Sequence, residues 1–219
     1  MAVERSALEC RLCQRAEGRS FHEDSRRYFR CDECGLVFVH PEAFLEAQRE
    51  RAVYDRHQNS PDDPRYRRFL SRLFDPVAGR LRPGSHGLGF GSGPGPTLSV
   101  MFEEAGHVVS VFDPFYADDA AVFGTRYDFI TASEVVEHLH RPREELERLW
   151  ECLLPGGVLG VMTKRVLGEA AFSRWHYKND PTHVCFFALQ TFEWLADHWA
   201  ARLEVVGDDV VVFEKPPAT

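Results

Sequence analysis

The sequence has no long apolar segment. Across its 219 residues, no run approaches the roughly 20 apolar residues that a membrane-spanning helix needs. The N-terminal residues Met-Ala-Val-Glu-Arg-Ser-Ala-Leu-Glu also lack the apolar core of a secretion signal. These absences argue against a membrane protein or a secreted one, and the cytoplasm is the expected location. A content of 44% hydrophobic and 27% charged residues is ordinary for a globular chain that buries a full core.

Basic residues are scarce in the second half of the chain. Residues 83–219 hold 10 Lys and Arg against 20 Asp and Glu, whereas residues 1–82 hold 16 against 14, so the two formal charges are −10 and +2. Affinity for nucleic acids comes largely from Lys and Arg that neutralise phosphates, so the acidic part is poorly suited to a phosphate backbone. A small or cationic substrate is expected there instead.

Four of the six cysteines form two close pairs near the N-terminus. They are Cys10, Cys13, Cys31 and Cys34, with two residues inside each pair and 17 between the pairs. This spacing is typical of four thiolates that surround one zinc ion and leave no position for water, so the zinc would be structural. Two disulfides or a redox pair are the alternatives, but the missing secretion signal favours reduced thiols. We predict a zinc ribbon over residues 1–41, with short strands at 27–30 and 36–39.

A helical linker is predicted over residues 42–84. Apolar residues between Tyr66 and Val77 recur at the spacing of one helix face, and Pro76 is expected to kink or end this helix. The polar segment 54–61 before it is expected to be a linker, or a lid over a ligand cleft.

A glycine-rich loop follows an apolar run after residue 85. The run Leu88-Gly89-Phe90-Gly91-Ser92-Gly93-Pro94-Gly95 is followed 18 residues later by Asp113, which ends a second apolar run. Glycines let backbone amides approach a ligand closely, and an acid at the tip of the next strand can accept hydrogen bonds from ribose hydroxyls. This unit predicts a site for an adenosine-type cofactor.

Strands and helices alternate from residue 87 onwards. We expect strands at 87–90, 108–112, 127–132 and 158–163, helices at 96–105 and 143–153, a further helix capped by Thr191, and a hairpin at 203–213. Such alternation predicts an α/β fold with a parallel sheet that carries helices on both faces. The hairpin would make the end of this sheet antiparallel. The predicted domain spans residues 85–219.

Several motifs of this domain resemble those of class I S-adenosylmethionine-dependent methyltransferases. They are the glycine loop with Asp113, the segment 127–139 with its Ser-Glu-Val-Val-Glu-His-Leu, and Leu-Pro-Gly-Gly at 154–157. The resemblance covers residues 85–215 and implies a Rossmann-like sheet. Its subtype is similar to the ubiquinone-biosynthesis O-methyltransferases, and the whole chain resembles a bacterial set of zinc-ribbon methyltransferases. Dinucleotide dehydrogenases also have a glycine loop, but their usual Gly-x-Gly-x-x-Gly differs from the alternating glycines here.

The resemblance implies a set of residues that bind S-adenosylmethionine. Asp113 would hold the ribose, and Gly89 stands where the family usually has an acid. The residues that would line the methionine part and flank the sulfonium are Gly91, Ser92, Gly93, Gly95, Ser133 and Glu134.

The loop from Trp175 to His183 is the candidate source of a catalytic base. It holds aromatics, two imidazoles and a carboxylate, and it follows a strand at whose carboxyl end such sheets bind ligands. We predict His183 as the base or the substrate orienter, with Asp180 fixing its tautomer and Trp175 or Tyr177 stacking on the substrate. The alternative is that the imidazoles only tie down backbone carbonyls. His138 is expected to be structural.

The predicted function is methyl transfer by in-line displacement, in which the protein aligns the nucleophile and excludes water. A small-molecule acceptor is favoured, with the ribbon as a substrate cap or a dimer surface. An RNA or protein acceptor that docks on the ribbon is one alternative, suggested by Arg26, Arg27 and Arg30. A module that binds the cofactor without catalysis is another. No membrane partner is expected, and the acceptor atom and the oligomeric state stay open.

Overall fold

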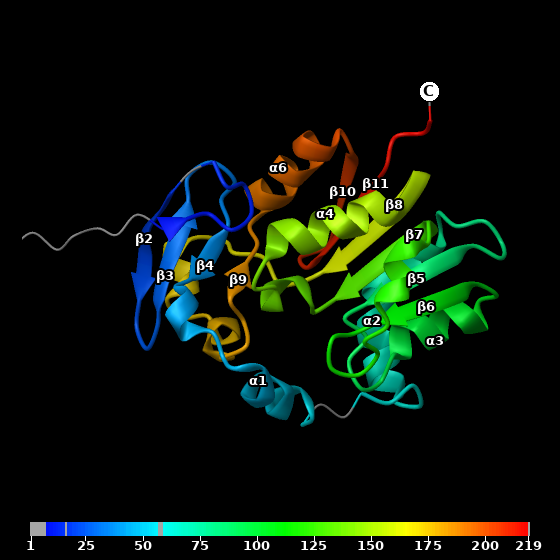
Figure 1. Ribbon diagram of the computed structural model, residues 1–219, viewed down its shortest axis with the longest axis horizontal. Helices are drawn as coiled ribbons and strands as arrows, with labels where there is room; N and C mark the ends of the chain where they lie inside the picture. The colour runs from blue at the N-terminus through cyan, green and yellow to red at the C-terminus, as the bar shows by residue number, and fades with distance from the viewer. Residues whose placement is uncertain (1–7, 16, 57–58, 219) are drawn as a thin grey trace, which may run out of the picture.

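The computed structural model describes residues 8–15, 17–56 and 59–218. Parts of the predicted ribbon, 1–7 and 16, and of the predicted lid, 57–58, lie outside this description, as does residue 219. The described chain forms a small sheet beside a larger one. Helix α1 (Ala47–Tyr54) lies on the segment that leads from the small sheet to the large one (Figure 1). Within these ranges, no helix combines the length and the apolar character needed to cross a membrane.

The small sheet has five antiparallel strands in the order β1-β2-β3-β4-β9. They are β1 (Leu8–Glu9), β2 (Glu17–Glu23), β3 (Arg27–Cys31), β4 (Val37–Val39) and β9 (Cys185–Phe186). β3 and β4 lie where the sequence predicts strands. β9, in contrast, comes from the C-terminal half, where Phe186 pairs with Val37 and Cys185 with Phe38. The ribbon sheet is therefore completed by a distant part of the chain.

The large sheet has six strands in the order β10-β11-β8-β7-β5-β6. They are β5 (His86–Phe90), β6 (Val108–Phe112), β7 (Tyr127–Ser133), β8 (Leu153–Met162), β10 (Arg202–Val206) and β11 (Val210–Glu214). The four strands β5 to β8 are parallel, and β11 runs antiparallel to both β8 and β10. The predicted α/β fold with an antiparallel C-terminal hairpin is confirmed.

Helices cover both faces of the large sheet (Figure 1). Along β11, Val210 and Val212 pack into a core beneath α2 and α3, whereas Val211 and Phe213 pack into the core on the other face, beneath α4 and α6. The helices are α1 (Ala47–Tyr54), α2 (Pro64–Ala78), α3 (Thr97–Glu104), α4 (Pro142–Cys152), α5 (Glu169–Phe172) and α6 (Leu189–Trp199). Short 3-10 turns are η1 (Pro41–Ala43), η2 (Ala120–Gly124), η3 (Val136–His138) and η4 (His176–Asn179).

Two helix boundaries differ from the sequence prediction. α2 continues through Pro76 to Ala78, because a proline in the last turn removes only one bond near the helix end. α6 begins at Leu189 instead of at Thr191, and the Thr191 hydroxyl accepts a hydrogen bond of 3.1 Å from the Ala188 amide. Thr191 thus caps the helix from inside its first turn.

The ribbon and the large sheet share one hydrophobic core. Leu36 and Phe38 of the ribbon are fully buried in the same cluster as Phe186 and Phe213. The Tyr28 ring of β3 also packs edge-on against Phe172 of α5, with 5.0 Å between ring centroids. Packing therefore continues across the predicted boundary at residue 41, and the ribbon and the segments beside the large sheet form one packed unit.

Candidate functional site

The glycine loop connects the end of β5 to α3. Gly91 has a φ of +71°, and its amide donates a hydrogen bond of 2.8 Å to the Phe112 carbonyl at the end of β6. A Cβ at position 91 would lie 2.5 Å from a methyl of Val135. Position 91 therefore requires glycine both for its backbone conformation and for its close approach to the loop after β7.

Asp113 follows directly after β6, and it is 7% exposed. One carboxylate oxygen accepts a hydrogen bond of 2.8 Å from the Gly93 amide, and the other accepts from the amides of Phe115 at 2.9 Å and Tyr116 at 3.2 Å. These bonds fix the carboxylate beside the glycine loop. A carboxylate has about four acceptor positions, so it retains capacity for a ligand hydroxyl.

A cavity of about 690 Å³ opens at the carboxyl ends of β5, β6 and β7, within the usual size range of ligand sites. Six of the seven predicted cofactor-binding residues line it: Gly91, Ser92, Gly93, Asp113, Ser133 and Glu134. Gly95 instead borders a separate cavity of about 40 Å³. The remaining wall comes from α1, α2 and α4, from the turn after β7 and from the loops after β6 and before β9.

The small cavity beside Gly95 is also lined by residues of β5 and α3. Gly89 borders it, and a Cβ at this position would lie 2.4 Å from the Ser99 hydroxyl of α3. The cavity is also lined by Thr97, whose hydroxyl is buried and has no partner within the described chain, and by Thr131. The side chains of Thr97, Ser99 and Thr131 thus bring three hydroxyl groups to this cavity.

Helix α1 closes the cavity from the side of the ribbon. Glu50 and Tyr54 of this helix line the cavity, and the Tyr54 hydroxyl donates a hydrogen bond of 2.8 Å to the Glu50 carboxylate. Asp55, just after the helix, accepts a bond of 2.6 Å from the hydroxyl of Tyr116, which follows β6. The second of these contacts ties the end of α1 to the loop after β6.

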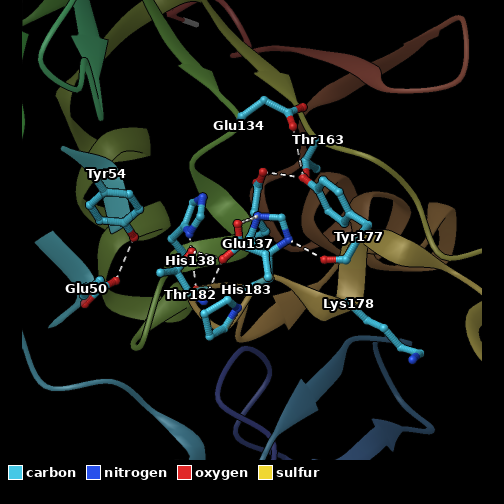
Figure 2. Close-up of polar contacts among 12 residues, drawn as sticks. Glu50, Tyr54, Glu134, Glu137, His138, Thr163, Tyr177, Lys178, Thr182 and His183 are labelled. Atoms are coloured by element: carbon cyan, nitrogen blue, oxygen red, sulfur yellow. Dashed lines mark hydrogen bonds and ion pairs between the residues drawn. The ribbon is translucent and has the colours of Figure 1, made fainter. Parts of the chain in front are cut away.

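The carboxylates of Glu134 and Glu137 both lie at the hydroxyl of Tyr177 (Figure 2). Glu134 directly follows β7 and has a φ of +53°, and Glu137 in η3 is fully buried. The Tyr177 hydroxyl bonds to Glu137 and lies 3.3 Å from Glu134 and 3.2 Å from the Thr163 hydroxyl. Burial raises the pKa of Glu134 to about 6, and burial with the nearby Glu134 charge raises the pKa of Glu137 to about 8. One Glu137 oxygen, Oε2, has no hydrogen-bond partner among the described residues.

His138 and His183 face each other next to Glu137, with 4.7 Å between their ring centroids (Figure 2). Nδ1 of His183 lies 2.8 Å from the Tyr177 carbonyl, and Nδ1 of His138 lies 3.2 Å from the Thr182 carbonyl. A carbonyl only accepts, so both Nδ1 atoms carry the proton in the neutral rings, and both Nε2 atoms carry the lone pair.

These three side chains could hold a metal ion. Glu137, His138 and His183 each offer one ligand atom, and the three atoms lie within 4.8 Å of one another. Histidine ligands of metals usually donate their other ring N–H to a carbonyl or a carboxylate, as both rings do here. This cluster is not among the sites predicted from the sequence. The Glu-His pair in Glu-Val-Val-Glu-His-Leu was visible, but its partner lies 45 residues away.

Of the residues predicted to act in catalysis, some line the cavity and others do not. His183 lines the cavity, and so does Asp180, whose Oδ2 lies 3.9 Å from Nε2 of His183. The Tyr177 carbonyl, instead of Asp180, holds Nδ1 and sets the tautomer. Tyr177 and Trp175 do not line the cavity, and their rings stack on each other with 4.9 Å between centroids. The His183 imidazole therefore does hold a backbone carbonyl, and the residue also lines the cavity.

The four N-terminal cysteines come together away from this cavity. Cys10, Cys13, Cys31 and Cys34 are buried, and none forms a disulfide. Their sulfur atoms lie within 4.8 Å of one another, with 3.5 Å between Cys10 and Cys34 and between Cys13 and Cys31. Four sulfurs at about 2.3 Å from a tetrahedral zinc ion would be about 3.8 Å apart, so the arrangement fits this ion.

Residues 55–206 match a family model described as a methyltransferase domain. The PH0226 protein from Pyrococcus horikoshii OT3 superposes with a TM-score of 0.52 at 13% identity, over 76% of this chain and 99% of that one. At this identity the likeness shows the fold alone. No curated protein matches the chain.

Two further solved structures have lower TM-scores. The 1,6-didemethyltoxoflavin-N1-methyltransferase from Burkholderia thailandensis, solved with 1,6-didemethyltoxoflavin and S-adenosylhomocysteine, has a TM-score of 0.47 at 15% identity, over 89% of this chain and 97% of that one. An O-methyltransferase family protein from the same organism has a TM-score of 0.49 at 15% identity, over 72% of this chain. The present chain covers 62% of that protein, which is less than two thirds of its length.

Proposed function

The chain belongs to the methyltransferase-domain family and is an S-adenosylmethionine-dependent methyltransferase, and we propose that its acceptor is a small molecule bound beside His138 and His183. The observation that carries this proposal is one continuous cavity, lined by Asp113 and the glycine loop as well as by both histidines. Cofactor and acceptor would share this space, which α1 covers. Such an arrangement meets the main requirement of methyl transfer, alignment of the nucleophile away from water.

The cofactor would be held by the residues around the glycine loop. When bound, S-adenosylmethionine supplies an electrophilic methyl group on a sulfonium. Asp113 would accept hydrogen bonds from the ribose hydroxyls, and Gly91, Ser92 and Gly93, which line the cavity, would lie along the methionine part. Ser133 and Glu134 would flank the sulfonium, where a carboxylate also favours the positive charge.

His183 is the proposed general base. Its Nδ1–H is committed to the Tyr177 carbonyl, so its Nε2 lone pair is the one directed to the site, 3.9 Å from Asp180. Nε2 would take the acceptor's proton as the acceptor attacks the electrophilic methyl group that S-adenosylmethionine would supply, with the bond electrons leaving on sulfur. His138 would orient the acceptor beside it.

A divalent cation on Glu137, His138 and His183 is the second candidate for activating the acceptor. Three observations support it: the three ligand atoms converge, both imidazoles are held through Nδ1, and Oε2 of Glu137 is buried without a hydrogen-bond partner in the described chain. Such a cation would lower the pKa of a bound hydroxyl. An oxygen acceptor, as in the ubiquinone-biosynthesis subtype, suits this chemistry.

The contacts of the ribbon arginines support a small acceptor over an RNA. Arg26 donates to backbone carbonyls of the loop before β9, and Arg30 bonds to Gln190 at 3.3 Å. Arg27 lies 3.6 Å from Glu42. An RNA or protein acceptor would have to compete with these contacts, so it remains the alternative.

We also propose that Cys10, Cys13, Cys31 and Cys34 hold a structural zinc ion. Support comes from their burial, their convergence and their free thiols. Thiolate ligands suit a reducing compartment, so the predicted cytoplasmic location is kept.

Transfer of labelled methyl groups tests the acceptor. The protein is incubated with methyl-labelled S-adenosylmethionine and a fractionated cell extract, and a His183→Gln variant is run in parallel. Label in the small-molecule fraction that depends on His183 is the expected result. Label found only in RNA or in protein would contradict the small-molecule proposal.

A further inference from the structure

A hairpin of the ribbon contacts the loop that carries His183. The turn between β2 and β3 places Arg26 against the chain from residue 178 to residue 183. Nη1 of Arg26 donates to the carbonyls of His183 at 2.9 Å and Pro181 at 3.4 Å. Nη2 donates to the carbonyls of Asp180 at 3.0 Å and of Lys178. One guanidinium thus binds four carbonyls of a single loop.

The same hairpin makes two further contacts with this loop. The Lys178 ammonium, whose side chain is 7% exposed, forms an ion pair with Asp24. The Tyr28 hydroxyl donates a hydrogen bond of 3.2 Å to the Lys178 carbonyl, and the Nε of Arg26 bonds to this hydroxyl at 3.2 Å. Asp24, Arg26 and Tyr28 therefore act on the loop together.

The loop needs such a partner because it has little regular structure of its own. η4 ends at Asn179 and β9 begins only at Cys185, so no helix or strand supplies partners for the carbonyls of Asp180, Pro181 and His183. The fork of the guanidinium can satisfy several carbonyls at once, which an ammonium cannot do with the same geometry.

We infer that Arg26 is a positioning residue for His183 and that the ribbon serves to set the loop of the catalytic base. Arg26 holds the carbonyl of His183, while the Tyr177 carbonyl holds its Nδ1. The backbone and the ring of His183, which lines the cavity, are thereby each held by a hydrogen bond. This role rests on the proposed function of His183, and it differs from that of a substrate-docking ribbon.

The test compares Arg26→Ala and Arg26→Lys with Arg27→Ala, whose arginine is exposed and contacts Glu42 instead of the loop. Hydrogen exchange of the peptide over 177–184 should accelerate by on the order of tenfold or more in R26A. Exchange should accelerate nearly as much in R26K and stay at the wild-type rate in R27A. Strands β5 and β6 should keep their protection in all three.

A spectroscopic readout separates positioning from mere stability. Nitrogen NMR of the imidazoles should show one tautomer of His183 in the wild type, protonated at Nδ1, and a mixture of tautomers in R26A. Millimolar guanidinium should restore the wild-type signal in R26A. Unchanged loop exchange and tautomer in R26A would overturn the inference, and so would a mixture that guanidinium leaves in place.

Two controls keep these results interpretable. If R26A does not fold, Arg26→Gln keeps the side-chain stem and is measured in the same way, with the same two outcomes. S-adenosylhomocysteine binding to the wild type is measured separately by calorimetry. Its absence contradicts the proposed function, whereas the loop measurements decide the role of Arg26.

Discussion

The guanidinium of Arg26 lies 2.9 Å from the carbonyl oxygen of His183, a residue 157 positions later in the chain. This bond joins the N-terminal ribbon to the loop that brings an imidazole to the cavity. β9 pairs with β4 a few residues further on, so the loop is held by the ribbon at both ends. The ribbon therefore supports the loop that reaches the site, although none of its described residues lines the cavity itself.

Removal of the proposed zinc should destabilise the whole chain. Cys10→Ser takes away one of four buried thiolates, and the ribbon core is continuous with that of the large sheet. We expect loss of one equivalent of zinc by elemental analysis and a melting temperature lower by more than about 5 °C. Cys152→Ser is the matched control, because Cys152 is equally buried but lies apart from the cluster. Full zinc content in the Cys10 variant would contradict the assignment.

The ion pair of Asp24 and Lys178 should make stability depend on pH. Burial alone would raise the pKa of Asp24. The hydrogen bonds that this carboxylate accepts from Lys178 and from the Arg26 amide outweigh burial and hold the pKa well below its ordinary value of 3.8. A lowered folded-state pKa contributes stability above that ordinary value, and the contribution is lost as the pH falls below it. Asp24→Asn should therefore cost about 1–2 kcal/mol at neutral pH in urea unfolding, and progressively less as the pH falls from about 4 toward 2.

The exposed pair of Arg19 and Asp32 provides the control for this measurement. Its side chains are 67% and 61% exposed, so Asp32→Asn should change the free energy of unfolding very little at any pH. An equal loss in both variants would rule out a special contribution from Asp24.

Manganese binding distinguishes the two candidate roles of His183. If Glu137, His138 and His183 hold a divalent cation, electron paramagnetic resonance of the zinc-loaded protein should detect one bound Mn²⁺. Glu137→Gln and His183→Gln should each weaken that binding by about 10- to 100-fold. His176→Gln is the control, because His176 is exposed in the same loop. Wild-type protein that binds no Mn²⁺ would leave His183 as a base without a cation.

Gly91 and Gly93 should respond differently to alanine. Both have a positive φ, but a Cβ at position 91 would lie 2.5 Å from Val135, whereas a Cβ at position 93 meets nothing within 4 Å. Gly93→Ala should cost about 1–2 kcal/mol from backbone strain alone, and Gly91→Ala should cost more. The double variant with Val135→Ala should recover the steric part. Equal melting temperatures for the two single variants would contradict this account.

The local pattern of the large sheet could be predicted from the sequence because each strand and helix is long enough to carry its own periodicity. The glycine loop and Asp113 were identified for the same reason, since they lie within one continuous strand-loop-helix-strand unit. Cys10 to Cys34 form a second continuous unit with a recognised spacing.

The relationships that were missed join short or distant segments. β9 has only two residues, so no alternation predicts that Cys185 and Phe186 complete the ribbon sheet. Glu137 and His138 stand beside each other, but His183 reaches them only because the loop before β9 folds back. The tautomer of His183 is set by a backbone carbonyl, which has no signal in the sequence. The sequence groups Arg26 with other basic residues as a possible docking surface, because its four partners are backbone carbonyls and backbone carbonyls leave no signal in a sequence.

Calorimetric titration with S-adenosylhomocysteine tests the central claim most directly, namely that the loop after Phe90 and Asp113 form the cofactor site. The wild type should bind one equivalent with measurable heat. Asp113→Asn should weaken binding by about 10- to 100-fold, because it removes charge-assisted acceptors and turns an amide toward the Gly93 N–H, while the exposed neighbour Asp118→Asn should bind as the wild type does. Absence of binding by the folded wild type, or undiminished affinity in the Asp113 variant, would contradict the account.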